Sequence, residues 1–125
     1  MVKRILVIDD EKPIRILLTK ILEKEGFEVT TAGDGDEGTR RQQADPFDLV
    51  ITDLIMPGKE GIELIREFKK DYPQTPIIAI SGGGMVAAQG YLKTAKVMGA
   101  EDTIEKPVIK DVIIEKVNRV LSQYV

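Results

Sequence analysis

Residues 4–10 read Arg-Ile-Leu-Val-Ile-Asp-Asp, a short run of branched apolar residues that ends in two consecutive aspartates. Apolar residues that follow one another without alternation are typical of a strand buried on both faces. Similar runs occur at residues 48–52 and 76–80, and weaker strands are predicted at 27–31 and 103–105. Strands of this kind occur in parallel sheets covered by helices on both sides.

Amphipathic stretches with helical spacing separate these strands. The first is predicted to begin at Pro13, a residue that the first turn tolerates, and to stop at Gly26. The others are predicted at residues 37–44, 62–68, 85–98 and 113–124, with a turn at 33–36. Five strand–helix units joined by right-handed crossovers predict one α/β domain over residues 1–125, a doubly wound five-stranded parallel sheet with five helices.

Composition excludes several kinds of chemistry. The 125 residues have a formal net charge of −3, which argues against binding nucleic acid or an anionic membrane through bulk electrostatics. The chain has no cysteine and no histidine, so disulfides, thiolate metal sites and Ser-His-Asp catalysis are excluded. The apolar runs are too short for a membrane span, and the start of the chain has no signal-peptide pattern. A cytoplasmic protein is therefore expected.

Polar side chains stand where the predicted strands end. Asp9 and Asp10 follow the first strand, Asp53 the third, Ser81 the fourth and Lys106 the fifth. Taken singly, each has an ordinary structural explanation: the aspartates and the serine can cap helices, and the lysine can be a solvated surface residue. In a parallel sheet, however, these ends meet at one edge, where ligands bind.

Together, three neighbouring carboxylates repel one another unless a cation lies among them. Without histidine or cysteine that cation must be a hard one, and Mg²⁺ suits carboxylate, carbonyl and water ligands. A lysine, a hydroxyl and the backbone N–H groups of Gly82, Gly83 and Gly84 would suit phosphate oxygens. The combination predicts a Mg²⁺-dependent site for a phosphoryl group.

The chain resembles a response-regulator receiver domain of two-component signalling over essentially its whole length, and is similar to the single-domain chemotaxis and sporulation regulators. The matching motifs are Ile5-Leu-Val-Ile-Asp-Asp10, Asp53-Leu-Ile-Met-Pro57 with Gly61, Ser81-Gly82 after an apolar strand, Gly99-Ala100, and Lys106-Pro107. The resemblance implies the flavodoxin-like strand order 2-1-3-4-5. It also implies a switch that changes partner binding when phosphorylated, rather than an enzyme acting on a separate substrate.

Site roles follow from the resemblance. Asp53 is implied to be the phosphoacceptor, with Lys106 and Ser81 contacting the phosphoryl group and Gly82 beside it. The implied Mg²⁺ ligands are Asp10, Asp53 and the main-chain carbonyl of Ile55, with Asp9 acting through water. The bond before Pro107 is expected to be cis.

Partners also follow from the resemblance: a sensor histidine kinase or phosphotransfer protein as donor, and a downstream protein or attached output domain as receiver of the signal. Candidate kinase contacts are Ile14, Arg15 and Leu18. A phosphorylation-dependent homodimer can form through the last two helices, where Lys110, Asp111, Lys116 and Arg119 are available for exposed pairs. The chain is expected to be either a complete single-domain regulator or a receiver from a longer protein.

Three features depart from the family pattern. Thr103 stands where an aromatic residue is usual, so the ordinary aromatic switch motion is not expected. Three glycines after Ser81, and Gly90, predict a mobile loop and a frayed start to the fourth helix. Ile55 and Gly83 stand at positions that tune dephosphorylation, and neither side chain can hold an attacking water, which predicts a long-lived phosphoryl group.

Three alternatives stay open from the sequence. The chain can be a binding scaffold that is never phosphorylated, although the intact acidic set argues against this. It can be a Mg²⁺-dependent phosphatase with an aspartyl nucleophile, although little chain is left for a substrate cap. It can bind flavin, although carboxylates beside the glycine loop would repel its phosphate.

Overall fold

The structure is a computed structural model that describes residues 2–54, 61–82 and 93–124. Its five strands are β1 (Arg4–Ile8), β2 (Glu28–Ala32), β3 (Leu49–Asp53), β4 (Ile77–Ser81) and β5 (Asp102–Glu105). All neighbouring strands pair in parallel, in the order β2-β1-β3-β4-β5. The predicted sheet and its strand order are confirmed, and the carboxyl ends of the strands meet at one edge.

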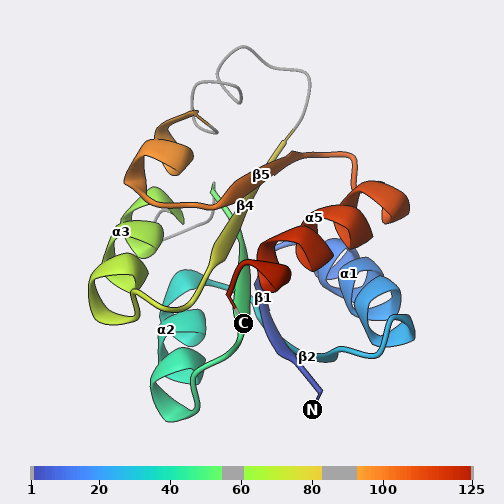
Figure 1. Cartoon of the computed structure of the whole chain (residues 1–125), viewed down its shortest axis with the longest axis horizontal. Helices are drawn as coiled ribbons and strands as arrows, with labels where there is room; N and C mark the ends of the chain where they lie inside the picture. The colour runs from blue at the N-terminus through green and yellow to red at the C-terminus, as the bar shows by residue number, and fades with distance from the viewer. Residues whose placement is uncertain (1, 55–60, 83–92, 125) are drawn as a thin grey trace.

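Helices cover both faces of the sheet (Figure 1). They are α1 (Lys12–Lys24), α2 (Gly35–Ala44), α3 (Gly61–Asp71) and α5 (Lys110–Ser122), and residues 93–98 are also helical. One face carries α1 and α5 over a core that includes Leu18 and Val117. The other carries α2 and α3 over a core that includes Leu64 and Phe68. Burial on both faces explains why the central strands lack alternation.

The start of α2 differs from the prediction. The helix begins at Gly35 rather than Glu37, because the Asp34 side chain accepts a hydrogen bond from the Glu37 N–H at 2.8 Å and caps it two residues earlier. A Cβ atom added at Gly38 would lie 2.4 Å from Ile8 Cδ1. The absence of a side chain at Gly38 therefore lets α2 pack closely on β1.

The fourth predicted helix is described only in its last part. Residues 93–98 are helical and Ala95 is buried in the core under α3. The glycine loop and the start of this helix lie outside the described residues. Among the three described segments, no helix combines the length and apolar character that a membrane crossing requires.

Candidate functional site

Two buried aspartates lie side by side at the carboxyl edge of the sheet. Ile8 of β1 pairs with Thr52 of β3, so the residues that follow, Asp9 and Asp53, are neighbours. Asp9 is 1% exposed and Asp53 is 5% exposed, whereas Asp10 is exposed. The sheet register thus brings the predicted acidic residues together. Burying two carboxylates side by side costs free energy of desolvation, which a nearby cation offsets.

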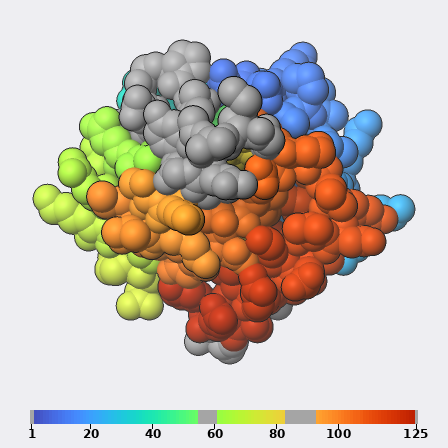
Figure 2. Space-filling view, turned by 90° about the horizontal axis from the view of Figure 1, so that it is seen from above, coloured from blue at the N-terminus to red at the C-terminus, as the bar shows by residue number. Residues whose placement is uncertain are grey.

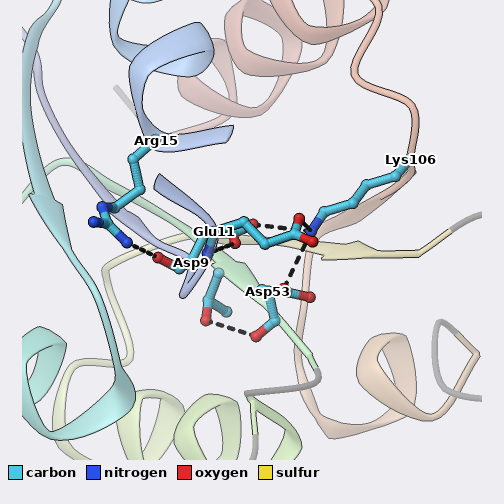
Figure 3. Close-up of polar contacts among 6 residues, drawn as sticks. Asp9, Glu11, Arg15, Asp53 and Lys106 are labelled. Carbon is cyan, nitrogen blue, oxygen red and sulfur yellow. Dashed lines mark hydrogen bonds and ion pairs between the residues drawn. The ribbon is translucent and has the colours of Figure 1, made fainter. Parts of the chain in front are cut away.

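Lys106 supplies one cation from the loop after β5 (Figure 3). Its Nζ atom lies 3.2 Å from Asp53 Oδ2, 3.2 Å from Asp9 Oδ2 and 2.9 Å from Glu11 Oε2. Burial alone would lower the pKa of Lys106, but its hydrogen bond to Glu11 and the charges of the two aspartates raise it well above the ordinary value. Glu11 had no predicted role, although its place as the third consecutive acidic residue was the available signal in the sequence.

Asp9 is held by its neighbours through both side chain and backbone. Its Oδ1 atom accepts the Glu11 N–H at 2.8 Å, and its carbonyl oxygen accepts a hydrogen bond from Arg15 Nη1 at 2.7 Å. Its Oδ2 atom is fully buried and, within the described residues, accepts no hydrogen bond; its contact with Lys106 is an ion pair only. Burial raises the pKa of Asp9, although the hydrogen bond from Glu11 and the Lys106 charge oppose this.

The three aspartates suit a small divalent cation. One carboxylate oxygen from each of Asp9, Asp10 and Asp53 lies within 4.8 Å of the others. Mg²⁺ binds oxygen ligands at about 2.0–2.1 Å, so opposite ligands stand about 4.2 Å apart and a small contraction suffices. The buried Asp9 Oδ2, which accepts no hydrogen bond within the described residues, and the excess of negative charge over Lys106 both favour such an ion. The predicted fourth ligand, the carbonyl of Ile55, lies outside the described residues.

Ser81 is the predicted hydroxyl of the site. It ends β4, one residue beyond Ile80, which pairs with Asp53. Its side chain is completely buried, and within the described part of the chain its Oγ atom has no hydrogen-bond partner. A buried hydroxyl without a partner costs about 1–3 kcal/mol, which a bound anion would recover. Gly82, next in the chain, is exposed, and open space surrounds its missing side chain.

Gly61 packs against the backbone of Asp53. A Cβ atom at this first residue of α3 would lie 2.3 Å from the Asp53 carbonyl oxygen and 2.5 Å from Leu54 Cα. The Gly61 N–H donates to the Leu54 carbonyl at 3.0 Å. No side chain fits here without moving Asp53, which explains physically why the motif places glycine at this distance from the aspartate.

Some predicted surface contacts are wrong. Leu18, a candidate kinase contact, lies on the core-facing side of α1 and is completely buried, whereas Ile16 and Leu17 are exposed. The helical stripe that marks Leu18 as apolar marks it as core. Ile14 and Arg15 are half-buried.

The proposed dimer pairs are also partly wrong. Lys116 donates to the Thr103 carbonyl at 2.6 Å and contacts Asp102 Oδ1 at 3.3 Å, and Arg119 contacts the same carboxylate. Asp102 is only 6% exposed, so its charge requires these partners. Lys116 and Arg119 are therefore engaged within the chain, while Lys110 and Asp111 are exposed.

Two other predictions concern the end of β5. The Lys106–Pro107 peptide bond is cis, as expected. Thr103 is half-buried, and its main chain joins β5 to α5 through Lys116. Thr103, which stands where an aromatic residue is usual, thus contributes a main-chain contact between β5 and α5.

The fold and the site define a parallel α/β domain with an acidic cation pocket where the strands end. The sequence matches the response regulator receiver domain over residues 5–118. The chain belongs to this family, whose members interact with histidine kinases in phosphorylation-dependent two-component signalling.

Individual relatives agree. The chain is 36% identical over 122 residues to the transcriptional regulatory protein ResD of Bacillus subtilis, covering 96% of this chain and 48% of ResD. It is 36% identical over 118 residues to the CAI-1 autoinducer sensor kinase/phosphatase CqsS of Vibrio cholerae, covering 92% of this chain and 17% of CqsS. The crystal structure of the receiver domain of NtrX from Brucella abortus is similar with a TM-score of 0.89 and 38% identity, covering 94% of this chain and 98% of that one. The chain thus spans less than half of both curated relatives.

Proposed function

We propose that Asp53 accepts a phosphoryl group from the phosphohistidine of a sensor histidine kinase or phosphotransfer protein, and that the phosphorylated form changes partner binding. The observation that carries this proposal is the position of the Asp53 carboxylate. This carboxylate is buried, lies close to those of Asp9 and Asp10, and stands 3.2 Å from the Lys106 ammonium. Asp53 pairs with Ile80 of β4, and the next residue of that strand is Ser81, whose hydroxyl has no hydrogen-bond partner within the described residues.

The transfer requires little covalent chemistry from the protein. A carboxylate oxygen of Asp53 forms a bond to phosphorus while the phosphorus–nitrogen bond to the donor histidine breaks, and the imidazole nitrogen keeps that electron pair. Asp9, Asp10 and Asp53 would hold Mg²⁺, which when bound supplies positive charge beside the transferring oxygens. Lys106 supplies a second positive charge, 3.2 Å from the Asp53 carboxylate.

The switch follows from groups that change partners. The Ser81 hydroxyl gains an acceptor when a phosphoryl oxygen arrives, and Lys106 exchanges a carboxylate oxygen for a phosphoryl oxygen. The movement passes to the loop after β4 and to the surface of residues 93–98, β5 and α5, which lie together on one face in Figure 2. Val97 there is 84% exposed, which suits contact with a downstream protein or an output domain.

Phosphorylation by a small donor tests the acceptor. Intact-mass spectrometry after treatment with acetyl phosphate and Mg²⁺ should show one added phosphoryl group. Asp53→Asn should abolish it, whereas the matched substitution Asp71→Asn, at an exposed position at the end of α3, should leave it unchanged. Full labelling of the Asp53→Asn variant would refute the assignment, and no labelling of the wild type would favour a binding scaffold.

The same sample tests lifetime and turnover. Because neither Ile55 nor Gly83 can position water through its side chain, the phosphoryl group should persist well beyond seconds after the donor is removed. Incubation with small phosphate esters should release no more phosphate than one equivalent of protein. Loss within seconds would contradict the lifetime, and multiple turnover would make the protein a phosphatase.

A further inference from the structure

A second concave site lies between α1 and the edge strand β2, separate from Asp53. It encloses about 340 Å³ and is lined by Lys12, Arg15, Ile16, Thr19, Lys20 and Thr31. Thr31 lies on the α1 side of the sheet because Val29, two residues earlier, packs in the core beneath α1. The groove is defined by these six residues.

Its charge is opposite to that of the whole protein. Three lining residues, Lys12, Arg15 and Lys20, are cationic, and no lining residue is acidic. Within the described part of the chain none of these three forms an ion pair with a carboxylate. Three uncompensated cations around one hollow, in a chain of net charge −3, attract an anion to this place rather than to the surface at large.

One of the cations is fixed in place. Arg15 Nη1 donates to the Asp9 carbonyl oxygen at 2.7 Å, and Figure 3 shows Arg15 on the side of Asp9 away from Lys106. The guanidinium has four further N–H donors in a planar array that suits phosphate. Because the side chain is already ordered, an anion that binds it pays less conformational entropy.

The groove also has an apolar part. Ile16 is 45% exposed although it is a large apolar residue, and the methylene stems of the two lysines extend this surface. The volume falls at the lower end of the range for small-molecule sites, about 300–1,000 Å³. A compact ligand that carries both an anionic group and a flat apolar group matches this mixed lining better than an extended acidic peptide, which offers mainly charges.

We propose that this groove binds a phosphorylated small molecule with a flat ring, of the mononucleotide class. Lys12, Arg15 and Lys20 contact the phosphate, the hydroxyls of Thr19 and Thr31 contact its polar substituents, and Ile16 contacts the ring. The site does not involve Asp53 and does not depend on the proposed phosphorylation.

Calorimetric titration of the full chain tests this, with a chelator present so that the acidic pocket holds no divalent cation. The probes are AMP, adenosine and inorganic phosphate. AMP should bind, and adenosine and phosphate should each bind at least about tenfold more weakly, because each lacks one half of the contacts. Lys12→Gln with Lys20→Gln should weaken AMP at least about tenfold through loss of two charge-assisted contacts. Lys24→Gln, on the same helix outside the groove, is the matched control and should change nothing.

Several results would overturn the proposal. These are no heat from AMP at millimolar concentration, adenosine binding as tightly as AMP, or equal affinity in the groove variant and the Lys24→Gln control. A hexaglutamate peptide that binds more tightly than AMP and loses affinity in the groove variant would assign the site to an acidic protein segment instead. Both lysines are exposed, so unchanged thermal unfolding of the variants is expected and checks that the fold is intact.

Discussion

At the amino edge of the sheet, Arg4 forms ion pairs with Glu28 and Asp45, and Lys69 forms one with Glu101 at 3.0 Å. At the carboxyl edge, one cation, Lys106, forms ion pairs with Asp9, Glu11 and Asp53, and two buried polar atoms accept or donate no hydrogen bond within the described residues. The same five strands run from one edge to the other, so the two edges differ only in the residues at the strand ends.

This difference in charge balance indicates that the amino edge contributes to stability, whereas the carboxyl edge is suited to binding a ligand. At the amino edge two cations share three carboxylates, so the charges named there are closer to balance than at the carboxyl edge. The carboxyl edge carries more negative charge than its own cation can balance and keeps a hydroxyl unpartnered, which lowers stability until a ligand arrives. Variants at the two edges should therefore respond differently to Mg²⁺.

The largest effect is expected for Lys106→Met. Removing the shared cation leaves three carboxylates facing one another and should lower the free energy of unfolding by about 2 kcal/mol without Mg²⁺. Mg²⁺ should restore more stability to this variant than to the wild type, because in the variant the ion does not compete with the Lys106 ammonium for the carboxylates. Urea unfolding with and without Mg²⁺ measures both.

Lys69→Met is the matched control, since it also breaks a partly buried ion pair but at the amino edge. It should lose stability with no change in the Mg²⁺ response. Equal Mg²⁺ responses in the two variants would contradict the proposed difference between the edges.

Asp9→Asn should have a smaller effect of opposite sign. The raised pKa of Asp9 means that the fold disfavours its charged form, so the neutral amide should stabilise the Mg²⁺-free protein, by less than the loss expected for Lys106→Met. This advantage should be complete at neutral pH and should vanish as pH falls below the ordinary aspartate value of about 4. The variant should also lose most of the stabilisation by Mg²⁺. A less stable variant at pH 7 would show that the Lys106 contact outweighs the burial of Asp9.

The smallest effect concerns the amino edge. Tyr124 donates its hydroxyl to Glu101, and this hydrogen bond raises the pKa of Tyr124 to about 12. Since the folded state favours the protonated phenol, its stabilisation is complete below pH 10 and is lost progressively as pH rises to about 12. The loss should be roughly 0.5 kcal/mol, because the group is partly exposed and solvent screens it.

Unfolding of the wild type and of Tyr124→Phe at pH 8 and pH 11 measures the contribution of this hydrogen bond to the free energy of unfolding. The wild type should lose its advantage over the variant at the higher pH. A constant difference between wild type and Tyr124→Phe would contradict the role of the hydrogen bond.

Much of the fold and the site could be predicted because both depend on short-range signals. Continuous apolar runs specify buried parallel strands, and the parallel arrangement alone brings Asp9, Asp53, Ser81 and Lys106 to one edge. The early start of α2 could not be predicted from helix propensity, because it depends on one capping bond from Asp34 and on how closely Gly38 packs against β1.

Partner choice among charged side chains was the least predictable feature. Glu11, Lys116 and Arg119 all look like solvated surface residues in sequence, yet each contacts a group on another element. The prediction of Leu18 as a surface contact was wrong for the converse reason. Periodicity identifies an apolar face of the helix but does not say which residues of that face reach solvent. Such contacts are set by three-dimensional neighbours many residues away.

The contact between Gly61 and the Asp53 carbonyl has a consequence for genetics and engineering. It makes the position of Asp53, the proposed acceptor, depend on a residue that carries no side chain and lies eight positions along the chain. Even the addition of one methyl group there should displace the Asp53 backbone, so that Gly61→Ala should lose labelling at Asp53 although it leaves every polar side chain of the site in the sequence. Saturation of this codon, followed by selection for signalling, should return glycine alone.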